Sequence, residues 1–119
     1  MPDPKDLVIN TGPLISLVAA TGDLEILRGR YTRIVVPAEV SAELLIGGPT
    51  GFAVPEFKAA TFLDIRTSPT ALGTFLANSL DPGEASVIQT ALDLQIATVC
   101  IDECVGRRIA RLIYLSVTG

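Results

Sequence analysis

The fold is decided by the stretch Leu80-Asp81-Pro82-Gly83-Glu84-Ala85, by the amphipathic run that follows it to Leu94, and by Ile96-Ala97-Thr98-Val99-Cys100-Ile101-Asp102-Glu103. The stretch begins with residues that start a helix: Asp81 suits the N-cap, Pro82 the first helical position and Glu84 the third. Apolar residues then recur at helical spacing behind Glu84. The final segment is apolar and β-branched, which predicts a strand buried on both faces of a parallel sheet. A helix, a buried strand and two acids at the carboxyl end of the strand form half of a βαβ unit with a ligand site at its top.

Short apolar strands and helices alternate along the rest of the chain. We expect strands at 7–9, 34–36, 62–65, 96–101 and 115–117, and helices at 14–18, 24–27, 38–45, 55–60, 67–76, 82–94 and 103–112. This alternation predicts the α/β class with a mainly parallel sheet. A chain of 119 residues has the length of one compact domain, which we expect to span residues 1–119.

Composition and charge narrow the function classes. The net charge of −4 argues against a general nucleic-acid-binding surface, although acids gathered around metal ions reverse the local sign. The apolar content of 49% is high, yet no apolar run approaches the roughly 20 residues that span a bilayer, and the first residues do not form a signal peptide. We therefore expect a cytoplasmic protein without a membrane segment and with a surface that binds another chain.

Histidine is absent, which excludes Ser-His and Cys-His nucleophile pairs and His-ligated zinc. The two cysteines, Cys100 and Cys104, lie close together in strand and helix-start contexts. We expect buried thiols at these positions rather than a structural disulfide.

Four oxygen-bearing side chains stand out by their positions: Asn10, Glu43, Glu84 and Asp102. Each has a plain structural explanation, which taken singly is the favoured one. Asn10 could be a turn residue or N-cap, and Glu43 a boundary acid with its head in water. Glu84 could complete a capping box, and Asp102 could be the N-cap of the next helix.

Taken together, the four side chains predict a metal site. Asn10 and Asp102 close strands at the same sheet edge, and we expect Glu43 and Glu84 to project from the buried faces of helices. Unpaired carboxylates near a core are costly, and no lysine lies nearby to pair with them. A divalent cation would supply the missing charge, and all-oxygen ligands suit Mg²⁺ or Mn²⁺ rather than zinc or copper.

Four motifs follow one another along the chain: Val8-Ile9-Asn10-Thr11-Gly12-Pro13-Leu14, Val36-Pro37-Ala38-Glu39-Val40-Ser41-Ala42-Glu43-Leu44, Leu80-Asp81-Pro82-Gly83-Glu84-Ala85, and Ile101-Asp102-Glu103 followed by Gly106-Arg107-Arg108-Ile109-Ala110. In these motifs, and over essentially its whole length, the chain resembles the PIN-domain family. The most similar branch is the prokaryotic one related to VapC-type toxin ribonucleases of toxin–antitoxin pairs.

The resemblance implies a three-layer α/β/α fold with the first strand beside the strand that ends at Asp102. It also implies Mg²⁺- or Mn²⁺-dependent hydrolysis of RNA phosphodiesters, with RNA as substrate and an antitoxin protein as partner. Carried over by position, the catalytic and metal-holding residues are Asn10, Glu43, Glu84 and Asp102, with Glu103 as an additional metal ligand. The apolar composition adds the expectation of a homo-oligomer.

Arginines offer phosphate contacts. Arg107 and Arg108 are the RNA-binding candidates, and Arg108 is the better one because it lies at the edge of an apolar helical stripe. Arg111 is a further candidate, although Glu103, Arg107 and Arg111 also have the spacing of a solvated ion-pair row. Another group could contact RNA or an acidic partner, or form a plain surface cluster: Arg28, Arg30 and Arg33.

Two features depart from the family pattern. Asn10 stands where much of the superfamily has an aspartate, so we expect lower metal affinity. Relatives usually continue beyond the segment matching Val117-Thr118-Gly119 into further helical structure, so we expect the C-terminal helical portion to be missing. Both features favour an alternative function, a catalytically degenerate module that binds an antitoxin or itself.

A phosphate-receiving signalling domain also places acids at strand ends, but it needs a lysine after a late strand, which the sequence lacks.

Overall fold

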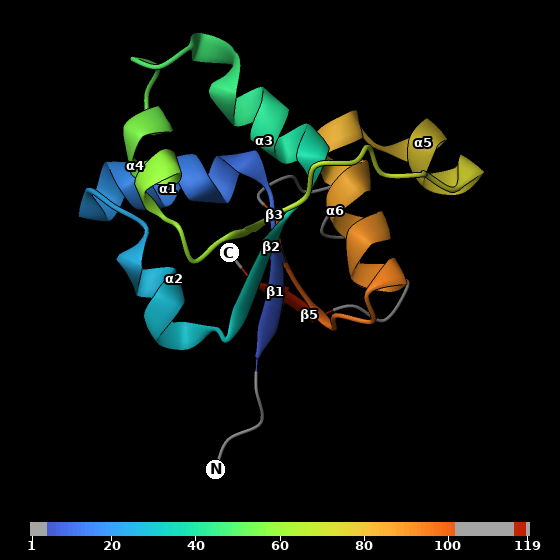
Figure 1. The fold of residues 1–119 in the computed structure, drawn as a ribbon. Helices are drawn as coiled ribbons and strands as arrows, with labels where there is room; N and C mark the ends of the chain where they lie inside the picture. The colour runs from blue at the N-terminus through green and yellow to red at the C-terminus, as the bar shows by residue number, and fades with distance from the viewer. Residues whose placement is uncertain (1–4, 102–115, 119) are drawn as a thin grey trace.

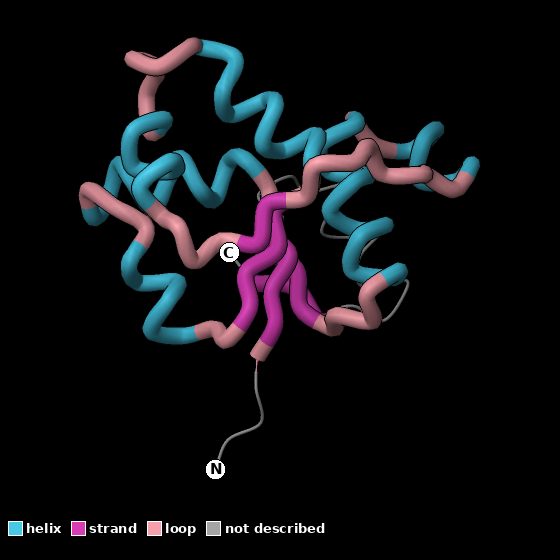
Figure 2. The backbone as a smooth tube through the Cα atoms, viewed as in Figure 1, coloured by secondary structure: helices cyan, strands magenta, loops and turns pink. Residues whose placement is uncertain are grey.

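The structure, a computed structural model, describes residues 5–101 and 116–118. Its centre is a five-stranded parallel sheet in the order β3-β2-β1-β4-β5 (Figure 2). In β1 and β4, Val8 pairs with Val99 and Ile9 with Cys100, so the first strand lies beside the strand that precedes Asp102, as expected. The strands are β1 (Asp6–Ile9), β2 (Arg33–Val36), β3 (Asp64–Ile65), β4 (Thr98–Cys100) and β5 (Ser116–Thr118).

Helices cover both faces of the sheet, which confirms the predicted three-layer α/β/α architecture (Figure 1). One face carries α1 (Thr11–Thr21), α2 (Glu25–Arg30) and α4 (Val54–Ala59). The opposite face carries α5 (Thr74–Ser79) and α6 (Pro82–Asp93). Beyond the carboxyl ends of the strands lie α3 (Ala38–Leu44) and the short 3-10 helix η1 (Leu45–Gly47).

The central strands contain continuous apolar runs because both faces of the sheet are buried. Val8, Val35 and Val99 are each 0% exposed, because helices cover the sheet from both sides. The helix predicted at 82–94 is confirmed at Pro82–Asp93, with Asp81 as its N-cap and Pro82 in its first turn. Its buried residues include Val87 and Ile88, so α6 is a core element that fixes its own N-terminus against the sheet.

The helix predicted at 67–76 is wrong. Residues 66–73 form an irregular segment, and α5 begins only at Thr74. The reason is tertiary: the backbone N–H of Thr70 donates to Glu39 Oε2 at 2.8 Å, and that of Gly73 donates to Gln89 Oε1 at 3.0 Å. Donors that a helix would use are therefore bonded to α3 and α6 instead.

Other predictions are corrected at their ends. The strand predicted at 62–65 is only Asp64–Ile65, because Leu63 N–H donates to Ala60 O and closes a turn there. Cys100 is a buried thiol, as expected, whereas Cys104 and the helix predicted at 103–112 lie outside the described residues. Within the described part of the chain, no helix is long and apolar enough to cross a membrane.

Candidate functional site

Asn10 lies at the carboxyl edge of the sheet, directly after β1. Its backbone N–H donates to Cys100 O at 3.1 Å, so the pairing of β1 with β4 continues to this residue. Its side chain is the N-cap of α1, with Oδ1 accepting from Thr11 N at 2.9 Å. An amide oxygen has two lone pairs, so the N-cap bond leaves one for a cation. The N-cap explanation and the ligand hypothesis are therefore compatible.

Three side-chain oxygens from three parts of the fold converge on Gly83, in the first turn of α6. A Cβ atom built on Gly83 would lie 2.8 Å from Glu43 Oε2, 3.4 Å from Asn10 Oδ1 and 3.4 Å from Asp81 Oδ1. Glu43 comes from α3, Asn10 from the end of β1, and Asp81 from the N-cap of α6. The side chains of Asn10 and Glu43 are thus brought together above the N-terminus of α6.

Glu84 is buried beside this point, with 6% of its surface exposed. Its backbone N–H donates to Asp81 Oδ1 at 2.9 Å. A hydrogen bond with the side chain of Glu84 is the main cause that holds the pKa of Asp81 below its ordinary value, against the opposing effect of burial. The carboxyl groups of Asp81 and Glu84 therefore lie close together at the start of α6. A bound cation would compensate the same crowded charge.

The prediction for Glu43 needs a correction. The helix α3 buries Val40 and Leu44, but Glu43 is exposed and does not project from the buried face. Its long side chain instead reaches the N-terminus of α6 from the exposed face of α3. The candidate site is therefore in contact with solvent where Glu43 enters it. Four predicted site residues lie outside the described residues: Asp102, Glu103, Arg107 and Arg108.

The donor set fits a hard divalent cation. Asn10, Glu43 and Glu84 offer only oxygen atoms, the ligand type of Mg²⁺ and Mn²⁺. In residues 5–101, no group of three or more histidine, cysteine, aspartate and glutamate side chains gathers closely enough to hold an ion alone. The described residues therefore bring together only part of the predicted ligand set, and one member of that part is an uncharged amide. The predicted ligand Asp102 comes directly after Ile101, the last residue described there.

Sequence reasoning missed the close approach at Gly83 and the buried hydroxyl of Thr11. Gly83 had a visible signal, because glycine in a helix costs up to about 1 kcal/mol relative to alanine and needs another reason to be there. That reason is the close approach of Glu43. The hydroxyl of Thr11 is buried and has no hydrogen-bond partner in the described structure, directly after Asn10. No sequence signal separates it from an ordinary helix-start threonine.

Asp81→Ala is expected to lower the free energy of unfolding by about 1 kcal/mol at neutral pH, because the N-cap bond to Glu84 is lost. Asp81→Asn is the matched control, since asparagine caps about as well. The stabilising effect of a carboxyl with a lowered pKa is complete above its ordinary pKa and disappears as pH falls through the lowered one. The difference between wild type and Asp81→Ala should therefore shrink in acid. Urea unfolding at several pH values measures it, and equal stabilities at pH 7 would contradict the cap.

The arginines of the first half of the chain lie away from this site. Arg33 begins β2, at the sheet edge opposite Asn10, and its Nε donates to Asp64 Oδ2 at 3.0 Å. Arg28 Nη1 lies 3.7 Å from Glu25 Oε2. The Arg28 guanidinium carbon lies 5.8 Å from the centre of the Phe62 ring. These contacts favour the interpretation as a surface cluster over an RNA contact.

The parallel sheet with side-chain oxygen atoms at its carboxyl edge defines an α/β domain of the class that binds ligands where strands end. Residues 6–119 match the DUF3368 family, described as a PIN domain, and the chain belongs to this PIN-domain family. The family assignment confirms the resemblance of the motifs and gives the chain a nuclease-type fold. No curated protein matched the sequence. The VapC-type branch and the missing C-terminal portion stay predictions.

Proposed function

We propose that this chain is a metal-dependent endoribonuclease that hydrolyses RNA phosphodiester bonds with Mg²⁺ or Mn²⁺. The observation that carries the proposal is the convergence of Asn10 and Glu43 oxygens on Gly83, beside the buried Glu84. Membership of the PIN-domain family supports a nuclease activity. RNA as the substrate and the identity of the ion go beyond that support.

The proposed ligands are Asn10, Glu43, Glu84 and Asp102, with Glu103 as an addition. Asp102 follows Ile101, and β4 lies beside the strand that delivers Asn10 to the same sheet edge. Bound Mg²⁺ or Mn²⁺ ions supply a water nucleophile at neutral pH and stabilise charge on the leaving oxygen. The chain itself then needs no histidine or other protein nucleophile, in agreement with its composition.

The other residues of the site would have separate roles in positioning the ion and in binding the RNA. Glu84 is buried in the first turn of a core helix, so its position would be set by the packing of α6. Glu43 reaches in from the exposed rim and can adjust to the substrate. Arg107 and Arg108 would hold flanking phosphates, since a guanidinium forms paired hydrogen bonds with phosphate oxygens.

Calorimetry with Mn²⁺ on wild type and Asp102→Ala tests this proposal, together with cleavage of single-stranded RNA in Mn²⁺ and in a chelator. Wild type should bind Mn²⁺ and cleave RNA only with the ion, and Asp102→Ala should lose both properties. Asp6→Ala is the matched control, because Asp6 begins β1, at the opposite end of the strand from Asn10. Identical titrations of wild type and Asp102→Ala would exclude the site assignment.

A degenerate, partner-binding module remains the second candidate. Its support is Asn10, which brings no charge, together with exposed apolar side chains around the glycine-rich turn after α3. There Ile46 is 89% exposed and Phe52 is 64% exposed. Such a module would give background cleavage even in saturating Mn²⁺, whereas the nuclease would not.

The same exposed side chains support the proposed protein partners, an antitoxin and a second copy of the chain. Large apolar groups that stay in water favour association. Light scattering over a wide concentration range tests self-association, and a constant monomer mass would exclude it. We further propose that the chain acts as a VapC-type toxin in the cytoplasm.

A further inference from the structure

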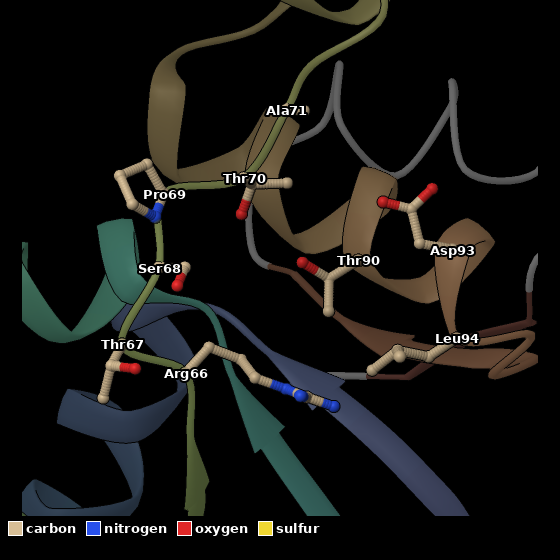
Figure 3. Close-up of a pocket in the computed structure, with 9 residues that line it drawn as sticks. All are labelled: Arg66, Thr67, Ser68, Pro69, Thr70, Ala71, Thr90, Asp93 and Leu94. Atoms are coloured by element: carbon tan, nitrogen blue, oxygen red, sulfur yellow. The ribbon is translucent and has the colours of Figure 1, made fainter.

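A polar cavity, separate from the candidate metal site, lies between the irregular segment after β3 and the helix α6 (Figure 3). It has a volume of about 260 Å³. Figure 3 shows the hydroxyl groups of Ser68 and Thr70 on one side, Thr90 on the other, the Arg66 side chain across one end and Asp93 at the opposite end. A guanidinium and hydroxyl groups such as those of Ser68 and Thr90 are donors that proteins use for phosphate oxygens. The hydroxyl of Thr70 already donates to Glu39 Oε1 at 2.9 Å.

Arg66 has hydrogen-bond donors to spare. Its nearest acid is Asp64, with Arg66 Nη2 3.7 Å from Asp64 Oδ2. The same carboxylate oxygen is already bound by Arg33, whose Nε and Nη2 both lie 3.0 Å away. Arg66 Nε is buried and makes no hydrogen bond in the described structure. The guanidinium thus lines the cavity and is held only by the long contact of Nη2 with an acid that Arg33 already binds more closely.

The fold connects this cavity to the candidate metal site. The backbone N–H of Arg66 donates to Val36 O at 2.9 Å, which places Arg66 at the same carboxyl edge of the sheet as Asn10. The helix α3 binds both regions: Glu39 accepts from the backbone N–H and hydroxyl of Thr70 at 2.8 and 2.9 Å, and Glu43, one turn later, reaches Gly83. Along α6, seven residues separate Gly83 from Thr90, an axial distance of about 10 Å.

We infer that the cavity with Arg66 at its end is a subsite for a backbone phosphate of the RNA strand, a short distance along the strand from the scissile bond. The inference rests on the proposed function, because it takes the same RNA as ligand. Asp93 opposes phosphate binding by its charge, but its carboxylate accepts a hydrogen bond from Gln89 Nε2 at 2.9 Å and lies away from the guanidinium. The subsite therefore holds an anion only loosely, as a positioning contact requires.

The test measures binding of a fluorescent single-stranded RNA oligonucleotide by anisotropy, in a chelator and over a series of salt concentrations. Arg66→Gln should weaken binding several-fold and make the slope of log affinity against log salt less steep by about 0.7, the contribution of one phosphate on a single strand. Asp93→Asn should tighten binding. Arg30→Gln is the matched control, because Arg30 is exposed at the end of α2, on the face of the sheet opposite α6, and should change neither quantity.

An unchanged salt slope in folded Arg66→Gln, or an equal change in Arg30→Gln, would overturn the subsite. If Arg66→Gln does not fold, Asp93→Asn decides, and unchanged RNA affinity in that variant counts against the subsite. Inorganic phosphate as a competitor separates the two sources of the anion: competition only at high concentration supports an RNA phosphate, and tight binding of free phosphate contradicts it. Because no metal is present, failure here is distinct from failure of Mn²⁺-dependent cleavage.

Discussion

Gly83→Ala is expected to lower Mn²⁺ affinity and the rate of RNA cleavage by at least about tenfold, the usual cost of disturbing the support of a metal ligand. The new Cβ would lie 2.8 Å from Glu43 Oε2, a distance that real Cβ atoms essentially never show. Since this oxygen is the end of a long, exposed side chain, the carboxylate will move and the backbone will not. Glu43 is thereby displaced from the site while the fold persists.

The same substitution should leave stability unchanged or raise it, because alanine is favoured over glycine in a helix by about 0.5–1 kcal/mol. Gly29→Ala is the matched control: Gly29 is helical, and a Cβ there meets nothing within 4 Å. That variant should gain similar stability and keep full metal binding and cleavage. Calorimetry, cleavage rates and thermal midpoints of the two variants measure the difference. A fully active Gly83→Ala would show that Glu43 takes no part in the site.

The sequence predicts α6 well because local chemistry and tertiary packing agree there. Asp81 and Pro82 start the helix in any context, and its apolar stripe then meets the sheet. The irregular segment at 66–73 shows the opposite case. Its Thr-Ser-Pro sequence suits a helix start, but Glu39 captures Thr70 from a distant part of the chain. A pattern within one segment contains no information about an acceptor that α3 supplies.

The sequence predicted part of the candidate site and missed another part. The position of Asn10 followed from the end of a buried strand, and that of Glu84 from the head of a buried helical stripe. The convergence of Glu43 with them depends on how α3 crosses the N-terminus of α6, which no periodicity encodes. The role of Gly83 depends on the same crossing. The sequence pattern predicts on which helix face or strand end each oxygen-bearing side chain lies. Only the packing of β1, α3 and α6 shows that these oxygens meet at Gly83.

The low charge of the site follows from Asn10 and bears directly on the choice between an active nuclease and a degenerate module. An amide ligand adds no attraction for the cation beyond its dipole. In the metal-free protein it also adds no repulsion to the carboxylates of Glu43 and Asp81 around Gly83. Asparagine therefore stabilises the empty site at the cost of affinity, and exchanging it for aspartate should reverse both effects.

Asn10→Asp is expected to tighten Mn²⁺ binding by roughly tenfold when the ion is added in excess. A carboxylate a few ångströms from the cation contributes on the order of 1 kcal/mol or more at an effective dielectric near 20, and about 1.4 kcal/mol corresponds to a factor of ten. Aspartate caps a helix as well as asparagine, so the bond to Thr11 N is retained and the change isolates the charge. Without metal, the variant should be less stable, because the new charge joins the acids around Gly83.

Cleavage rates and thermal midpoints with and without excess Mn²⁺ then separate the two functions. In a working nuclease, cleavage rises with metal affinity. In a degenerate module, cleavage stays at background while the metal-free protein loses stability. Asn78→Asp, the same substitution at an exposed position of α5, controls for a change of net charge. If Asn10→Asp alters neither the metal affinity nor the metal-free stability, Asn10 does not face the acidic cluster, and the candidate site loses its ligand from the sheet edge.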